Sequence, residues 1–382
     1  MLYCRQTLLR TPTRVNRLSP TLSLYLARQF TVAFLAALGV IVGLIMLFDM
    51  IELLRRTVTI DIGLAALIGM ALLKMPHTVQ ETLPFIVLIA MMFALFRLAR
   101  SHELVVIRSA GVSVWQVLGP PILLVAAVGV LNVVFFNPIA ADMYETYQRR
   151  EDMMLARGAT TLNVGEGGLW LREVRGDVAS IVHADRLHQD GSVLRLRGNV
   201  TIFLTDTHEG LQHRYQAPTG DILDGFIRLD DAVELAPGKT AIDHKELFLP
   251  SGITAAKVQD SFASPESMSI WSLPRFIRFS EEAGFSVIPH RLYWQSLLVS
   301  PFMLLAMTLL AAVFCLSATT RAMTWTMRGL AGLGVGFLFY FFNRFTYALG
   351  LSATLPIVLA AWAPTVITML LGLGYLFHRE DG

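Results

Sequence analysis

Four polar residues near the ends of two apolar segments are suited to binding anionic groups. They are Arg55 and Arg56, which follow the first apolar run, and Asn343 and Arg344, which lie near the end of a later one. A cation at the edge of the hydrocarbon layer is costly without a partner, and a guanidinium binds phosphate through two parallel hydrogen bonds. These residues therefore predict contacts with an amphiphile that carries anionic groups. Snorkelling of the arginines to lipid headgroups is the alternative.

A second polar stretch lies between two apolar runs and is interpreted as a short helix over residues 101–110. Ser101 is a good helix cap, Glu103 falls in the first turn, where the helix dipole favours an acid, and Gly111 suits the stop. Such a helix is suited to docking on a cytoplasmic ATPase; a simple turn between two spans is the alternative. The residues assigned to docking are Arg100, Ser101, Glu103 and Arg108.

Glycine pairs four residues apart occur in two apolar runs. Gly39 with Gly43, and Gly332 with Gly336, each leave a smooth stripe along a helix. Another helix backbone can approach such a stripe closely. The stripes predict weakly bonded seams that part and reclose, as in a lateral gate for a lipid. Ordinary close packing of helices is the alternative.

The sequence contains no catalytic or metal-binding pattern. The segment Pro237-Gly238-Lys239-Thr240 resembles the end of a phosphate-binding loop, but Val233 stands where the first glycine is required, so we interpret it as a turn. The two cysteines, Cys4 and Cys315, cannot form a disulfide framework or a CxxC site. We therefore predict no enzymatic activity, no ATP use by the chain itself, no cofactor and no metal. Five histidines without close ligand spacing are interpreted as solvated surface residues: His183, His188, His208, His213 and His244.

The composition is that of a membrane protein. Of the 382 residues, 54% are hydrophobic and 16% are charged, with a mean hydropathy of +0.56, whereas soluble domains carry about 25% charged residues. The 31 lysines and arginines nearly balance the 29 aspartates and glutamates. This balance excludes a broadly basic surface for nucleic acid.

The charges concentrate in one block. Residues 142–290 hold 22 acidic and 15 basic residues, as a water-facing domain between two membrane portions would. From 162 to 253, bursts of alternating apolar and polar residues predict roughly ten antiparallel strands in a sandwich or jelly roll. Residues 142–157 and 269–284 are predicted as flanking helices. The domain is either a passive module or binds an acyl chain or another β-domain.

Six membrane spans are predicted from the lengths of the apolar runs. Residues 62–73 are expected as a helix at the outer interface, which Pro76 and Pro84 kink into the second span. With the N-terminus in the cytoplasm, this count places most loop arginines inside, as the positive-inside rule requires. The approximate spans are residues 30–48, 82–96, 114–136, 296–316, 329–349 and 355–377.

The predicted fold is therefore an α-helical membrane protein with six transmembrane helices and an inserted all-β, jelly-roll-like domain on the outer face. Residues 1–28 form a cytoplasmic extension, and residues 29–141 carry three spans with the cytoplasmic helix 101–110. Residues 142–290 form the β-domain with its flanking helices, and residues 291–382 carry three more spans. Both termini are expected in the cytoplasm.

The stretch Ser101-His-Glu-Leu-Val-Val-Ile-Arg-Ser-Ala-Gly111, set in this layout, resembles the permease subunits of lipopolysaccharide export systems. The stretch Phe339-Tyr-Phe-Phe-Asn-Arg-Phe and the run Glu52-Leu-Leu-Arg55-Arg56 look more like the G-type than the F-type branch of this family. The resemblance implies an ABC exporter in the bacterial inner membrane, with the β-domain in the periplasm.

The resemblance also implies partners and residue roles. The implied partners are a cytoplasmic ATPase dimer (LptB type), a paralogous permease (LptF type), a single-span jelly-roll protein (LptC type) and lipopolysaccharide. Glu103 falls where the family has the acid that meets the ATPase. Arg55 and Arg56 fall where the family has paired lysines facing the substrate phosphates, whereas Asn343 and Arg344 replace less basic residues.

Two other interpretations stay open on the sequence. The chain is alternatively the F-type paralogue of the same complex, or a membrane-anchored envelope sensor or scaffold that transports nothing. An intramembrane enzyme is disfavoured because catalytic residues are missing.

Overall fold

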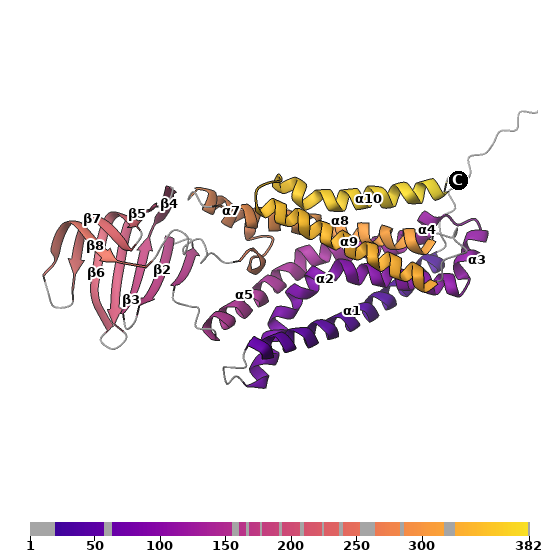
Figure 1. The fold of residues 1–382 in the computed structure, drawn as a ribbon, viewed down its shortest axis with the longest axis horizontal. Helices are drawn as coiled ribbons and strands as arrows, with labels where there is room; N and C mark the ends of the chain where they lie inside the picture. The colour runs from indigo at the N-terminus through magenta and orange to yellow at the C-terminus, as the bar shows by residue number, and fades with distance from the viewer. Residues whose placement is uncertain are drawn as a thin grey trace, which may run out of the picture.

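A computed structural model shows a helical part with a β-sheet at one end and the short helix α3 (Glu103–Ser109) at the other (Figure 1). Most of the predicted N-terminal extension, with Cys4, lies outside the described residues, as do His208 and the segment Pro237–Lys239. The structure describes residues 20–56, 63–154, 160–165, 168–175, 178–190, 193–206, 210–223, 225–236, 240–252, 264–282, 286–316 and 325–380.

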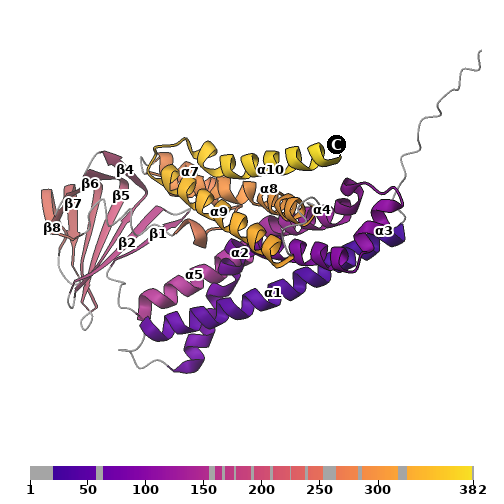
Figure 2. The same cartoon turned by 45° about the vertical axis from the view of Figure 1, so that its right-hand side comes forward.

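Long helices that lie side by side make up the helical part (Figure 2). The π-helix η1 (Asn132–Phe136) joins α4 to α5 without a break, so the predicted third span and the predicted helix after it form one continuous rod. The long helices are α1 (Pro20–Arg56), α2 (Leu64–Arg100), α4 (Val114–Leu131), α5 (Asn137–Met154), α8 (Ile288–Leu316), α9 (Trp325–Leu351) and α10 (Ile357–Glu380).

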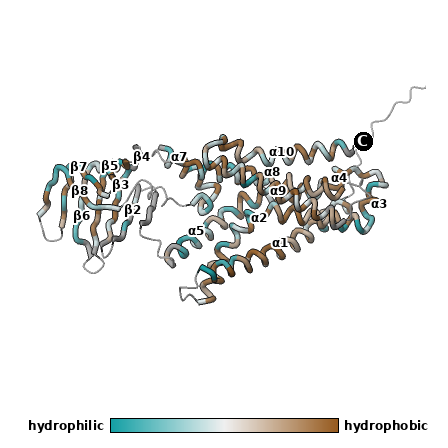
Figure 3. The backbone as a smooth tube through the Cα atoms, in the orientation of Figure 1, coloured by the Kyte–Doolittle hydropathy of each residue, from teal (hydrophilic) through white to brown (hydrophobic). Residues whose placement is uncertain are grey.

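The helices α2 and α8 form the centre of the bundle, because both carry apolar residues around much of their circumference. Ile86 and Met91 of α2 are fully buried and belong to one core with Met307 of α8. Figure 3 shows how apolar residues dominate the helical part. Helix α1 differs, since 11% of its most apolar stretch is buried against 61% for α2. One side of α1 is therefore uncovered in the single chain.

Five helical segments in the described part of the chain are long and apolar enough to cross a membrane: α1, α2, the α4–η1–α5 rod, α8 and α10. The predicted fifth span falls on α9, a 27-residue helix that carries Asn343 and Arg344 and is not among the five. Residues 62–73 were expected as a separate helix at the outer interface, kinked into the second span. The described part of this segment, from residue 64, instead forms the first turns of α2. This helix continues through Pro76 and Pro84 to Arg100.

The β-sheet comprises eight described strands, all in antiparallel pairs, which confirms the strands predicted from the alternating pattern, although roughly ten were expected. They pair in the order β1-β2-β3-β5-β6-β7-β8, and β4 pairs with β5. The strands are β1 (Thr160–Gly165), β2 (Gly168–Arg175), β3 (Val178–Ala184), β4 (Arg186–Asp190), β5 (Val193–Asp206), β6 (Gly210–Leu223), β7 (Phe226–Leu235) and β8 (Ile242–Pro250).

The order of the described strands is that of a meander, whereas the predicted jelly roll would contain Greek-key connections. The pairing register of the two longest strands, β5 and β6, shifts between Arg197 and Val200. The two residues in between, Gly198 and Asn199, have φ angles of 72° and 40°. Such irregularities bend a strand and increase its twist. The apolar side chains on both sides of this bend, Leu196 among them, share one core.

Hydrogen bonds between side chains and backbone connect the α4–η1–α5 rod to the segment that returns from the sheet. The Asn137 side chain accepts a hydrogen bond from the Ile270 backbone N–H at 2.8 Å and donates one to Gln80 at 3.4 Å. Gln148 donates to Ser264 at 2.8 Å. The return segment continues through the 3-10 helix η2 (Pro265–Ser267) and α7 (Leu273–Glu282), which lies within the predicted flanking helix.

Candidate functional site

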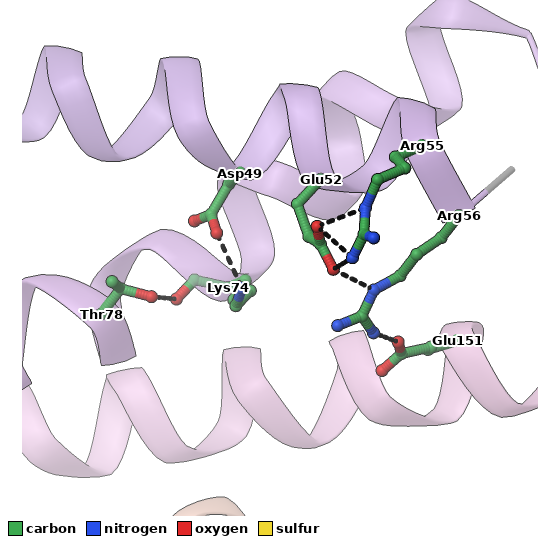
Figure 4. Close-up of polar contacts among 7 residues, drawn as sticks. All are labelled: Asp49, Glu52, Arg55, Arg56, Lys74, Thr78 and Glu151. Atoms are coloured by element: carbon green, nitrogen blue, oxygen red, sulfur yellow. Dashed lines mark hydrogen bonds and ion pairs between the residues drawn. The ribbon is translucent and has the colours of Figure 1, made fainter.

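The predicted arginine pair lies at the C-terminal end of α1, where one carboxylate bridges both side chains (Figure 4). Arg55 Nε donates to Glu52 Oε2 at 3.1 Å, and Arg56 Nε donates to Glu52 Oε1 at 2.7 Å. Arg56 also reaches α5, where its Nη1 lies 3.0 Å from Glu151 Oε1. Exposed pairs of this kind are only weakly stabilising, so the guanidiniums can exchange these carboxylates for a more highly charged phosphate.

Two turns closer to the bundle, α1 and α2 share an ion pair that the sequence prediction missed. Lys74 Nζ lies 2.7 Å from Asp49 Oδ1, and the Asp49 side chain is 11% exposed (Figure 4). Asp49 Oδ2 is buried and has no hydrogen-bond partner among the residues that the structure describes. The sequence did contain a signal, because Asp49 directly follows an uncharged run of 19 residues and Lys74 separates two apolar runs. A charge inside a span usually has a partner in the bundle.

The second predicted pair, on α9, does not join the first. Arg344 Nη2 donates to Glu81 of α2 at 2.9 Å, and its Nε donates to the Tyr340 hydroxyl at 3.1 Å. Glu81 lies seven residues after Lys74 on α2, which is a rise of about 10 Å. Helix α2 thus holds α1 through one ion pair and α9 through another. The Asn343 side chain is only partly exposed beside Arg344.

The predicted docking helix is present, but it begins later than expected. Helix α3 starts at Glu103, and the residue before it is His102, which has a φ angle of 60°. The prediction that Ser101 caps this helix is wrong: its hydroxyl donates to the carbonyl of Arg97 at 3.0 Å and so closes the end of α2, whose last residue is Arg100. A serine hydroxyl can bond back to the preceding turn as readily as it caps the next helix.

Helix α3 has one partly buried side and one exposed side. Leu104 and Ile107 pack against a small core formed by α1, α2 and α4, whereas Val105 and Val106 are 64% and 65% exposed. Glu103 accepts a hydrogen bond from the Tyr25 hydroxyl of α1 at 2.7 Å. Arg108 lies in the last turn, and Gly111 has a φ angle of 83°, as expected for the stop.

The two glycine stripes lie in different environments. A Cβ atom added to Gly336 would lie 2.3 Å from Leu88 Cδ2, and one added to Gly332 would lie 2.5 Å from Met92 Cε. This stripe is therefore a close contact between α9 and α2 of the same chain. At Gly39 and Gly43 no atom of the described residues lies within 4 Å of such a Cβ. The stripe on α1 faces away from the described part of the chain.

Comparison with known proteins agrees with this architecture. The family described as "Lipopolysaccharide export system permease LptF/LptG" matches residues 24–379. The chain belongs to the LptF/LptG family. It is 24% identical to the LptG permease protein of Haemophilus influenzae over 94% of this chain and 99% of that protein. It is 23% identical to LptG of Escherichia coli K12, over 81% and 84% of the two chains.

Membership of the LptF/LptG family, together with the apolar helices, makes this chain a multi-pass membrane protein of the lipopolysaccharide transport permeases. The matched range includes α1 with its arginines, α3, the sheet and α9. The family therefore covers each of the elements that position the predicted residues. It does not by itself assign their roles.

In this permease, the two glycine stripes make opposite predictions for stability. Gly336→Leu inserts a side chain into a closed contact with fully buried Leu88, and we expect it to lower the free energy of unfolding by about 1–3 kcal/mol. Gly39→Leu adds a side chain in open space and should not lower it. Denaturation of the two purified variants in the same detergent tests this, and an equal loss in both would contradict the packing difference.

The histidines of the β-sheet do not all lie free on the surface, as was predicted for them. His188 is exposed, but His213 Nδ1 and His244 Nε2 lie 2.8 and 3.0 Å from the carboxylate of Glu234. The hydrogen bond with His244 is the main reason that the pKa of Glu234 is lowered from its ordinary value. The His183 ring packs against the Trp170 ring, with the two planes tilted by 46°. Within the described residues, no group of three or more His, Cys, Asp or Glu side chains could hold a metal ion.

Proposed function

We propose that this chain is the G-type permease of the lipopolysaccharide exporter and that it crosses the inner membrane six times, with α9 as the fifth span. Both termini lie in the cytoplasm and residues 142–290 lie in the periplasm. The G-type assignment is supported by the two curated relatives, both named LptG. The orientation is supported by the positions of α3 and the sheet at opposite ends of the helical part (Figure 1). An ATPase can then meet one end while a periplasmic partner meets the other.

The observation that carries the proposal is the uncovered face of α1. Val40 and Leu44 are 65% and 49% exposed there, beside Gly39 and Gly43, which no other helix among the described segments approaches. Small residues let a neighbouring helix backbone come close within a membrane. The proposed occupant is a helix of the paralogous permease (LptF type). The seam between the two chains is the lateral gate through which the lipid enters.

The other two partners meet the ends of the molecule. The ATPase dimer (LptB type) contacts α3 through Glu103, Arg108 and the exposed valines, together with Arg100 and Ser101 at the adjoining end of α2. The single-span jelly-roll protein (LptC type) pairs with the sheet, whose terminal strands in the described order are β1 and β8. Strand addition to a sheet edge supplies backbone hydrogen bonds for such a contact.

The proposed mechanism uses charge to load the lipid and shape change to release it. Lipopolysaccharide enters sideways from the outer leaflet. Its phosphates replace the carboxylates of Glu52 and Glu151 as the partners of Arg55 and Arg56. Asn343 and Arg344 add polar groups on α9. Closure of the ATPase dimer on ATP moves α3, narrows the cavity between the permeases and drives the lipid towards the sheet.

Loading of the substrate tests this proposal. In vesicles that contain the chain with an F-type permease and the ATPase, the double variant Arg55→Ala/Arg56→Ala should hold at least tenfold less lipopolysaccharide per complex, since two charge-assisted contacts are lost. The matched control is Arg149→Ala, an arginine that is 73% exposed and paired with Glu145. It should load normally.

Three results would separate the alternatives. Unchanged loading in the double variant would remove the arginines from the substrate site. Purification without an ATPase or a second permease would favour the sensor or scaffold. Stable pairing with a G-type chain, and not with an F-type chain, would assign this protein to the F-type branch.

A further inference from the structure

A cavity of about 400 Å³ opens between α7, α8 and α10, on elements that the proposed transport mechanism does not use. Its lining combines charged and apolar side chains: Arg278 and Glu281 of α7, Arg291 of α8, Ile277, Ile357 and Val358. We call it the α7–α10 cavity. The cavity lies where α8 and α10 begin, at the end of the helical part that faces the sheet (Figure 1).

The charged side of the α7–α10 cavity has an excess of positive charge. Glu281 forms an ion pair with Arg291, whose side chain is half exposed. Arg278 is exposed, and its Nε donates to the carbonyl of Pro274 at 3.4 Å. None of the ion pairs among the described residues includes its two terminal nitrogens. The described lining therefore contains two guanidiniums and one carboxylate, which contacts Arg291. Arginine forks of this kind match the geometry of phosphate oxygens.

The opposite side of the cavity is apolar, and exposed apolar side chains follow it along α8 and α10. Val358 on the cavity wall is 55% exposed, and Phe302 of α8 is 44% exposed. The Phe302 ring centroid lies 5.6 Å from that of Trp362, one turn after Val358 on α10, and the Trp362 indole N–H donates to Gln295 Oε1 at 3.0 Å. A charged site beside exposed apolar side chains fits a molecule with a charged head and an alkyl chain.

Helix α7 has the pattern of a helix that lies in a membrane interface. Leu273 and Ile277 are buried, whereas Arg278 is exposed on its other side. Just before it, Trp271 is 65% exposed, as is common for aromatic residues at headgroup level. Basic side chains on the polar face of such a helix attract anionic lipids.

We propose that the α7–α10 cavity binds the phosphate-bearing headgroup of an anionic membrane phospholipid, with Arg278 and Arg291 on the phosphate and the acyl chains between α8 and α10. The site is separate from the arginines of α1 and goes beyond the transport function proposed above. It gives the permease a bound lipid that holds α7, and with it the connection to the sheet, against the membrane helices.

Binding of a short-chain lipid to the full chain in detergent tests the proposal. Dihexanoyl phosphatidylglycerol, followed by native mass spectrometry, should bind the wild type and should bind Arg278→Gln/Arg291→Gln at least tenfold more weakly. The matched control is Arg275→Gln, since this arginine lies on the same helix but does not line the cavity. It should change binding less than twofold. Dihexanoyl phosphatidylcholine should bind several-fold more weakly than the anionic lipid.

A second variant keeps both arginines and fills the α7–α10 cavity with a larger side chain. Val358→Trp, at an exposed position on the cavity wall, should displace the lipid while leaving the unfolding temperature unchanged. Equal binding to wild type and the double arginine variant, or equal weakening by Arg275→Gln, would overturn the proposal. So would displacement of the lipid by millimolar inorganic phosphate, which would identify the site as one for free phosphate. Loss of lipopolysaccharide loading with retained phosphatidylglycerol binding would leave this site standing and remove only the transport mechanism.

Discussion

Glu103→Ala is expected to abolish ATP-driven release of lipopolysaccharide, with at least a thirtyfold lower rate, while ATP hydrolysis by the partner continues. Glu103 begins the short helix α3, next to the exposed Val105 and Val106. Truncating one member of a charged contact at a buried interface costs about 2–5 kcal/mol, because its partner is left unpaired. Release to a jelly-roll acceptor, measured in vesicles beside phosphate production, reports both quantities together.

The hydrogen bond between Glu103 and the Tyr25 hydroxyl supplies the control for this experiment. Tyr25→Phe removes the intramolecular contact of 2.7 Å but keeps the carboxylate. If Glu103 acts on the ATPase, Tyr25→Phe should retain most of the release that Glu103→Ala loses. Equal loss in both variants would instead show that Glu103 only fixes α3 on α1. Full release with Glu103→Ala would contradict the docking role.

Features that depend on local sequence were predicted well. The run lengths of apolar residues anticipated the long helices, and the alternating pattern anticipated the antiparallel strands. Gly111 was predicted as the stop after the short helix, and its φ angle of 83° is one that glycine adopts without strain. Each of these properties is fixed by neighbours along the chain.

Features that depend on a choice between competing partners were not predicted, whether those partners are near or far in sequence. The two glycine stripes have the same spacing, yet only that on α9 meets a helix of its own chain. Ser101 had two carbonyl groups and a new helix within reach, and local geometry favoured the carbonyls. Asp49 and Lys74 are 25 residues apart and lie on two successive helices, α1 and α2. No period in the sequence specifies which charge meets which.

The second large effect is expected at this pair of α1 and α2. Asp49→Leu or Lys74→Leu alone leaves one charge without its partner in a largely buried position, and we expect each to lower the free energy of unfolding by roughly 3 kcal/mol. The double variant Asp49→Leu/Lys74→Leu should recover most of that loss, because two apolar side chains can fill the same space without a desolvation cost. Unfolding in detergent gives the four values of the cycle. The exposed pair Glu145–Arg149 is the control, and its single variants should cost less than about 1 kcal/mol.

The same four proteins also distinguish a structural pair from one that positions the substrate site. Asp49 lies six residues before Arg55 on one helix, so a shift of α1 against α2 moves the arginines as well. If the pair only stabilises the fold, the double leucine variant should load lipopolysaccharide like the wild type. If its directional contact fixes the arginines, the double variant should be stable yet load several-fold less. The charge exchange Asp49→Lys/Lys74→Asp, which restores the contact, should then recover loading. If the double leucine variant and the charge-exchange variant both load lipopolysaccharide like the wild type, the positioning role is excluded.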